Sequence, residues 1–341
     1  MDEDMKKILG GVKSLLEGLK AWWNKEEDAV PIEPNDPIIT DPPPEPEPEI
    51  EAPNVAGPLW KNNKVNTFTD VDGLVIDGFE VNNVDIALKF KGINRGVKVL
   101  NSKGQDVTKF VHVDYEHGAE VHDFEMDTIE VFNFRKSVAD IAPNSSNILM
   151  KNIIGDANFN RSGNFVMCIH IRENCKNSSI FDAVLSNIVY YENSWKPKLY
   201  QNNGDGIVYE GGCTNIVIVR PIITFSTQSG IDSKSAFTLI DGRITLCRQA
   251  IKTWATDKPY IFKGLNVFKQ CNAQDMFAKL IQIYPDLEAK TTKVSGGAGI
   301  WAKRKEVKFE GIETKYADGK KSIVPGGNIQ LIDTSTTIRI D

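Results

Sequence analysis

The sequence predicts an all-β body, built as a right-handed parallel β-helix (a solenoid), that follows a short amphipathic helix and a linker rich in proline and glutamate. Three observations lead to this prediction: short apolar runs separated by turn residues, a loose internal repeat, and two changes of composition along the chain. We therefore divide the chain into a helix at residues 1–25, a linker at 26–57 and a β-helix body at 58–341.

Residues 1–25 have the pattern of an amphipathic helix, because apolar side chains recur at steps of three and four with Lys and Glu between them. The apolar positions are Ile8, Val12, Leu15, Leu16, Leu19, Trp22 and Trp23. A lone helix of this length is marginal in water, so the apolar stripe must meet another surface. We expect a partner protein or self-association. A lipid surface is the alternative, although such helices usually have a more basic polar face.

The linker, residues 26–57, contains the run DPPPEPEPE at 41–49. Proline removes backbone donors and favours extended polyproline geometry, while the like charges repel one another. This composition predicts a solvated, fairly stiff spacer. We therefore expect the helix before it to anchor the body to another surface.

The body has many short runs rich in Val, Ile, Phe and Thr, such as residues 73–77, 215–219 and 237–240, with Asn, Gly, Asp and Ser between them. A β-sandwich and a β-solenoid both fit such runs, and internal repetition favours the solenoid. Ile231 and Ile251 are 20 residues apart, and Ile207 and Ile231 are 24 residues apart. Stacked coils would bury a column of aliphatic residues and let asparagines form ladders at the corners.

The bulk composition argues against several classes of protein. A formal net charge of −6 without a clustered basic face argues against nucleic acid as a partner. No apolar run approaches the ~20 residues of a membrane span, and the acidic start of the chain is wrong for a secretory signal, so we expect synthesis in the cytoplasm. The cysteines have no metal-site spacing and are expected to be reduced and buried: Cys168, Cys175, Cys213, Cys247 and Cys271.

Alignment of four strands on their apolar residue gathers acids and bases on one face. Because side chains alternate across a strand, one outward column reads His170, Val208, Asp232 and Lys252, and a second reads Arg172, Glu210, Lys234 and Trp254. With rungs ~4.8 Å apart, Asp232 would neighbour Lys252 and Glu210 would neighbour Lys234. Arg248 and Asp205 lie at the ends of the same strands.

This face predicts a saccharide-binding groove, in which charged groups bind hydroxyls or acidic sugars and an aromatic ring offers a flat surface. The residues predicted to bind substrate are Asp205, Glu210, His170, Arg172, Trp254 and Tyr209. The alternative is a solvated ladder of compensating salt bridges, which any exposed parallel sheet could carry.

Two stretches, 203–207 (NGDGI) and 229–235 (SGIDSKS), resemble the strand repeats of the pectate-lyase-like superfamily. That superfamily includes polysaccharide lyases, mannuronan epimerases and bacteriophage tailspike depolymerases, and the resemblance covers about residues 140 to 280. The anchor helix and acidic linker are most similar to those of a virion-attached spike. The resemblance implies a homotrimer that is docked on a virion or other anchor protein through residues 1–25 and acts on an acidic polysaccharide at the bacterial cell surface.

The resemblance also implies a lyase reaction, in which a basic residue abstracts the proton α to a uronate carboxyl group. On that reading Lys252 and Lys234 are the candidate bases, with Arg248 and Asp232 as their electrostatic partners. A carboxylate partner alone would raise the pKa of a lysine, so this role also needs desolvation or a cationic neighbour.

Hydrolysis is the second candidate reaction and needs two carboxylates ~5 to 9.5 Å apart, for which Asp205, Glu210 and Asp232 qualify by position. We expect no cofactor. Ca²⁺ held by Asp205 and Asp232 is an alternative, although two carboxylates are fewer than a full calcium site needs.

The evenly spaced histidines and a short basic run near the C-terminus are interpreted as surface features. His112, His117 and His122 are evenly spaced, but odd spacing alternates faces in a strand, so we expect exposed histidines and no metal site. Residues 301–305 (WAKRK) read as a basic loop near the last coils. Beside the depolymerase we keep two other functions open: a non-catalytic carbohydrate-binding adhesin or structural virion fibre, and an intracellular scaffold.

Overall fold

The structure is a computed structural model that describes residues 65–160, 165–189, 204–254, 256–270, 298–302, 307–310, 313–317, 320–324, 329–331 and 338–340. The chain divides into two units, Met1–Ile50 and Glu51–Asp341, and all of the described residues belong to the second. The helix predicted at 1–25 and the linker predicted at 26–57 lie outside the described residues.

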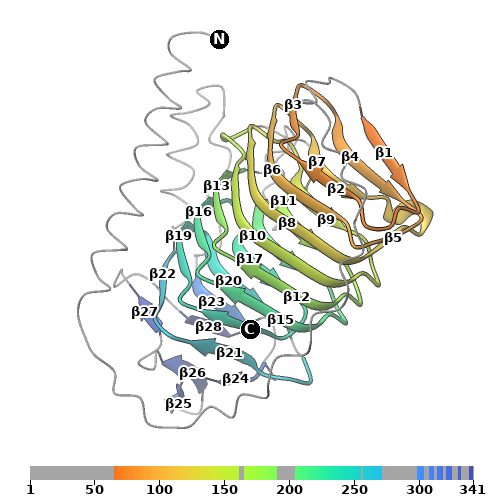
Figure 1. The fold of residues 1–341 in the computed structure, drawn as a ribbon. Coiled ribbons are helices and arrows are strands. Elements are labelled where there is room, and N and C mark those ends of the chain that lie inside the picture. Colours follow the sequence, from red (N-terminus) through yellow and green to blue (C-terminus); the bar gives the residue numbers. More distant parts are fainter. Residues whose placement is uncertain are drawn as a thin grey trace, which may run out of the picture. The chain divides into compact units, whose positions relative to one another are not determined.

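The described residues form an all-β structure dominated by two long sheets of parallel strands (Figure 1). The first sheet has ten strands, in the order β1 (Asn66–Thr69), β4 (Ile86–Lys91), β7 (Lys109–Val113), β9 (Ser137–Ile141), β11 (Val166–Ile171), β14 (Gly204–Tyr209), β17 (Ser229–Ser233), β20 (Gln249–Thr253), β23 (Ala298–Ala302) and β28 (Ile338–Ile340).

The second sheet has sixteen strands: β2 (Val75–Asp77), β3 (Glu80–Asn82), β5 (Ile93–Arg95), β6 (Lys98–Gln105), β8 (Glu120–Phe132), β10 (Ser146–Asp156), β12 (Lys176–Phe181), β13 (Val184–Ile188), β15 (Thr214–Val219), β16 (Ile222–Ser226), β18 (Phe237–Ile240), β19 (Arg243–Cys247), β21 (Tyr260–Lys263), β22 (Asn266–Gln270), β24 (Phe309–Glu310) and β27 (Ile329–Leu331). An antiparallel pair, β25 (Glu313–Ala317) and β26 (Lys320–Val324), stands apart from both sheets.

The chain passes alternately between the two sheets. We call a rung one strand of the ten-stranded sheet together with the strands of the sixteen-stranded sheet that follow it. Successive rungs pair in parallel, with Ile207 opposite Ile231 and Ile231 opposite Ile251. The repeat offsets read from the sequence are therefore the spacings between rungs, and the arrangement is compatible with a parallel β-helix.

Helical structure is almost absent from the described residues. A short 3₁₀ turn, η1 (Tyr115–His117), follows β7 and ends at Gly118 in the left-handed conformation. None of the described helical structure is long and apolar enough to cross a membrane.

The core lies between the inward faces of the sheets and consists of stacked columns of apolar side chains. The column of Ile207, Ile231 and Ile251 is fully buried. Phe68 stacks on Phe90 of the next rung, with 5.4 Å between ring centroids, and Phe90 meets Phe124 of β8 edge-on at 6.1 Å. Burial of each such side chain stabilises the fold by about 1.5–3 kcal/mol. The four described cysteines are also buried and free, as predicted, and Cys271 lies outside the described residues.

Asparagine and aspartate occupy corner positions where the backbone adopts positive φ. Asp123, Asn147, Asn177 and Asn215 have φ between 53° and 55°. These two residue types tolerate the left-handed region better than most. Along this corner each asparagine amide donates to the side-chain oxygen one rung back, at 2.7, 2.8 and 2.9 Å. The predicted asparagine ladder is confirmed at this corner.

Substitution of Asn177 separates the ladder from the backbone conformation. Asn177→Gly keeps the positive φ but removes the amide, and we expect a loss of about 1 kcal/mol in the free energy of unfolding. Asn177→Ala also places a Cβ in the left-handed region, so it should lose about 1–2 kcal/mol more. Urea unfolding of both variants tests this, and equal losses for Gly and Ala would contradict the backbone assignment.

Candidate functional site

The side of the ten-stranded sheet that points away from the core carries a column of mostly polar side chains, which we call the polar face. Each residue of this column follows a buried aliphatic residue such as Ile207, Ile231 or Ile251. The column runs, rung by rung, through Lys89, His112, Asp140, His170, Val208, Asp232, Lys252 and Trp301. The predicted register of His170, Val208, Asp232 and Lys252 is therefore confirmed.

Small residues before the aliphatic column let these rungs pack closely. A Cβ added to Gly206 would lie 2.5 Å from the carbonyl oxygen of Gly230, and one added to Gly230 would lie 2.2 Å from a methyl group of Ile244. These two glycines are required by close approach of neighbouring backbone and side chains. They fix the strand positions that place Asp205 and Asp232.

The N-terminal half of the polar face is organised around the buried carboxylate of Asp140, in a group that we call the histidine cluster. The side chain of Asp140 is 3% exposed and accepts hydrogen bonds from Lys109 Nζ at 2.7 Å and Arg172 Nε at 2.8 Å. The Nδ1 atoms of His112 and His170 lie 3.3 and 3.4 Å from its two oxygens. Burial alone would raise the pKa of Asp140, but these basic neighbours hold it far below its usual range.

The two histidines link Asp140 to further carboxylates on either side. His112 Nε2 lies 3.8 Å from Asp114 Oδ1, and His170 Nε2 lies 3.5 Å from Glu210 Oε1. Burial would lower the pKa of His170, but its two carboxylate neighbours raise it above its ordinary value. Burial would likewise raise the pKa of Glu210, but hydrogen bonding with His170 and Lys234 lowers it to about 2. Carboxylates and imidazoles thus alternate along this half of the face.

Lys109 is the lysine of the histidine cluster. Burial lowers its pKa although Asp140 lies beside it. Its Nζ atom also lies 3.0 Å from His112 Nδ1.

Tyr115, from the 3₁₀ turn η1, covers the histidine cluster. The guanidinium carbon of Arg172 lies 3.4 Å from the centre of the Tyr115 ring, and the ring of His112 meets the same ring edge-on at 5.9 Å. The turn after β7 therefore closes this end of the polar face and keeps Asp140 out of water.

The C-terminal half is a tryptophan cluster around an ion pair between Asp232 and Lys252. Trp254 Nε1 donates to the second oxygen of Asp232 at 2.9 Å. The Lys252 ammonium lies over two indole rings, 5.4 Å from the centre of Trp254 and 5.8 Å from that of Trp301. Lys234, paired with Glu210, lies 5.9 Å from the centre of Trp254. Two flat rings thus flank a fixed pair of opposite charges.

Asp205 adds a second carboxyl group beside Asp232. Its Oδ1 accepts a hydrogen bond from the backbone N–H of Ser229 at 2.9 Å, and the side chain is buried. Burial, followed by the charge of Asp232, raises the pKa of Asp205 to about 8. Near neutral pH Asp205 therefore favours its protonated form, and the neighbouring Asp232 forms an ion pair with Lys252.

The structure brings most of the residues predicted from the sequence to the polar face. His170 and Arg172 lie in the histidine cluster, Glu210 and Lys234 lie between the clusters, and the others lie in or beside the tryptophan cluster, where Arg248 is buried just before β20. Tyr209 differs. It points into the core, where its hydroxyl lies 2.8 Å from Ser178 Oγ, because it has the inward parity of its strand.

Several polar-face residues were missed, and two expectations were wrong. Alignment on Val111 and Ala139, two rungs and one rung before His170, would have found His112 and Asp140. His112 is buried, which corrects the expectation of exposed histidines, although the side chain of His117 is 68% exposed. Trp301 lies in strand β23, which corrects the loop expected there.

Metal ligation has little support among the described residues, where no group of three or more His, Cys, Asp or Glu side chains could hold a metal ion. The oxygens of Asp232 bind Lys252 and Trp254, and Asp205 binds a backbone N–H.

Comparison with known proteins gives no relative. No protein-family model matches the chain, and neither a curated protein nor a solved structure matches it.

Removal of the central carboxylate tests the histidine cluster. Asp140→Asn would leave Lys109 and Arg172 buried without their anion, and we expect a loss of about 3–5 kcal/mol in the free energy of unfolding. Asp182→Asn is the matched control, because Asp182 pairs with Arg220 at 2.8 Å with both side chains more than a third exposed. It should lose at most about 1 kcal/mol. Similar small losses for both variants in urea unfolding would contradict a buried hub.

The raised pKa of His170 predicts a pH dependence of stability. A raised pKa in the folded state stabilises the fold below the ordinary value of about 6.5, and this contribution is lost as pH rises through the folded value. His170→Gln should therefore lose about 1.5–3 kcal/mol near pH 5.5, the usual contribution of a charged hydrogen bond, and clearly less near pH 9. A difference from wild type that grows with pH would oppose the assignment.

Proposed function

We propose that this chain is a right-handed parallel β-helix of the pectate-lyase-like kind that binds an extended, acidic bacterial polysaccharide along its polar face and cleaves it. The observation that carries the proposal is the tryptophan cluster, where Trp254 and Trp301 flank the Asp232–Lys252 pair. Flat indole surfaces beside fixed hydrogen-bonding groups suit a sugar ring, which has an apolar face and polar edges.

A repetitive polymer fits a surface whose binding positions repeat from rung to rung. The polar groups of this face continue across successive rungs from the histidine cluster to the tryptophan cluster. Lys234 is the more exposed member of its ion pair, at 42% against 15% for Glu210. Its ammonium group can therefore contact a uronate carboxylate while it remains close to Glu210, which supports an acidic polymer.

Hydrolysis is the reaction that the geometry supports best. It needs one protonated carboxyl group and one carboxylate. Burial raises the pKa of Asp205 to about 8, and Asp232, on the neighbouring rung, forms an ion pair with Lys252. Asp205 would donate a proton to the leaving oxygen as the glycosidic bond breaks, and Asp232, as general base, would take a proton from the water molecule that attacks the anomeric carbon. Because the polar face buries Asp205, substrate binding must open the contacts above it.

The lyase reaction has weaker support at the residues first chosen for it. Lys252 and Lys234 form ion pairs with Asp232 and Glu210, and a carboxylate partner opposes the use of a lysine as a base. Lys109 is a better base, because burial lowers its pKa and Arg172 lies nearby as a cationic neighbour. A lyase on this face would therefore use the histidine cluster.

Attachment to a virion completes the proposal. The amphipathic pattern of residues 1–25 and the acidic proline-rich linker support a spike that is anchored at its N-terminus and acts at the bacterial surface. Trimer formation follows from the resemblance to tailspikes.

The second candidate function is non-catalytic binding on the same face. It is favoured by the low exposure of Asp205 and Asp232, at 1% and 8%.

Incubation of the purified protein with a panel of acidic capsular polysaccharides tests these functions together. Shorter chains with new reducing ends and no rise in the ultraviolet absorbance of unsaturated uronate are expected, and they would establish hydrolysis. Asp205→Asn should then slow cleavage at least about 100-fold while binding is kept. Rising absorbance that is lost in Lys109→Ala would instead establish a lyase.

Trp254→Ala tests the binding surface itself and should weaken binding about tenfold, the effect of losing about 1.4 kcal/mol of ring contact. Trp254→Phe keeps a ring and should bind more tightly than the alanine variant. Lys98→Ala, a change on the exposed side of β6, should leave binding unchanged. Binding of a polymer without any shortening would assign the non-catalytic function, and absence of binding across acidic and neutral polymers would overturn the proposal.

A further inference from the structure

The first rung differs from the later rungs in the burial of its inward side chains. Phe68 is paired in register with Phe90, and Ile76 with Val99. Phe90 and Val99 are fully buried, whereas Phe68 and Ile76 are only partly buried. The same apolar columns that are closed inside the structure therefore reach its N-terminal end incompletely covered. Repeat structures need an atypical terminal unit to cover such an end.

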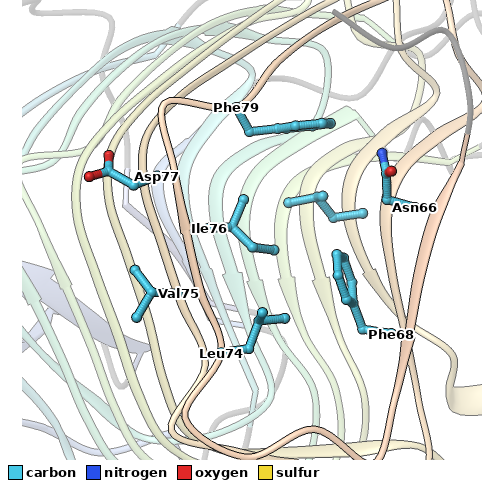
Figure 2. Close-up of a pocket in the computed structure, with 8 residues that line it drawn as sticks. Asn66, Phe68, Leu74, Val75, Ile76, Asp77 and Phe79 are labelled. Carbon is cyan, nitrogen blue, oxygen red and sulfur yellow. The ribbon is translucent and has the colours of Figure 1, made fainter. Parts of the chain in front are cut away.

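A cavity of about 200 Å³ lies at this end of the columns. Figure 2 shows Leu74, Ile76 and Phe79 on one side of it and Phe68 on the other. The remaining lining residues are Asn66, Val75, Asp77 and Leu88. The two polar ones have partners: Asn66 donates to the carbonyl of Ala87 at 3.3 Å, and Asp77 accepts from Asn101 at 2.9 Å. The cavity therefore suits an apolar occupant about the size of one large side chain.

The chain itself supplies such an occupant immediately before β1. After the acidic proline-rich run, the sequence VAGPLW at 55–60 is the last apolar stretch before Asn66. Trp60 precedes Asn66 by six positions, and this tether reaches at most ~20 Å, which keeps Trp60 near the first rung. A short tether also gives a high effective concentration at the cavity, higher than any separate molecule would reach.

We propose that Leu59 and Trp60 fold back over the first rung, with the Trp60 ring in this cavity. The segment that joins the linker to β1 then caps the N-terminal end of the sheets. The cap covers Phe68, Leu74 and Ile76. It also fixes where the stiff linker leaves the body, because the chain must start from the covered end. This inference is independent of the proposed function, since no residue of the polar face takes part.

Disulfide trapping in the full-length chain tests the contact. Leu59→Cys combined with Ile76→Cys should form an intramolecular crosslink on mild oxidation, detected by peptide mass spectrometry. Leu59→Cys combined with Lys98→Cys is the matched control, because the Lys98 side chain is 51% exposed, on the side of β6 away from the cavity. The control should not crosslink. An intermolecular crosslink at the cavity would assign a second copy as occupant, and no crosslink in a protein with a native circular-dichroism spectrum would overturn the cap.

Loss of the ring gives a second, independent readout. Trp60→Ser should lower Tm by about 4–8 °C, the shift for exposing one large apolar side chain in a body of this size. It should also increase the binding of an apolar dye at the uncovered cavity. Trp22→Ser, the same change in the N-terminal amphipathic segment, should leave Tm of the body unchanged. Equal Tm values for Trp60→Ser and wild type would contradict the proposal.

Discussion

In-register parallel pairing between rungs is the constraint on which the rest of the structure depends. When Ile207 pairs with Ile231 and Ile231 with Ile251, the residues that follow them in these strands also come into register with one another. One pairing therefore produces the aliphatic columns of the core, the asparagine ladder at the corner and the polar face. Each column must suit a neighbour of its own kind about 4.8 Å away. Isoleucine can stack on isoleucine and asparagine on asparagine from rung to rung, whereas charged residues need a neighbour of opposite charge on the next rung.

The polar face shows how charges meet this requirement. Like charges one rung apart would repel strongly where they are buried, so carboxylates meet lysine, arginine or histidine on the adjacent rungs. Asp140 binds Lys109 and Arg172, and Asp232 binds Lys252. Such buried pairs contribute little net stability but make each member hard to remove. These buried pairs lie on one face beside two tryptophans, which favours a binding surface. A ladder of solvated salt bridges would not need its members to be buried.

The sequence predicted the all-β body, the rung offsets and the pairing of His170, Val208, Asp232 and Lys252, because isoleucine at a fixed offset reports the register directly. It did not reveal the histidine cluster. There the aliphatic marker is Val111 or Ala139 and the spacing between rungs changes, so the register signal is weaker. Trp301 was missed because Ile300, which pairs with Ile251, comes 49 positions after it, against offsets of 24 and 20 between the rungs before. Tyr209 was predicted to bind substrate although the alternation that points Val208 and Glu210 outward points Tyr209 into the core.

The measurement that tests this account most directly is a double-mutant cycle at Asp232 and Lys252, which are separated by 20 residues in the chain and by one rung in the structure. Asp232→Asn, Lys252→Met and the double variant would be compared by urea unfolding. Direct contact between the two side chains predicts a coupling energy of at least about 1 kcal/mol, with the double variant more stable than the sum of the single losses implies. Additive losses would show that the two residues do not meet and would contradict the register from which the polar face is built.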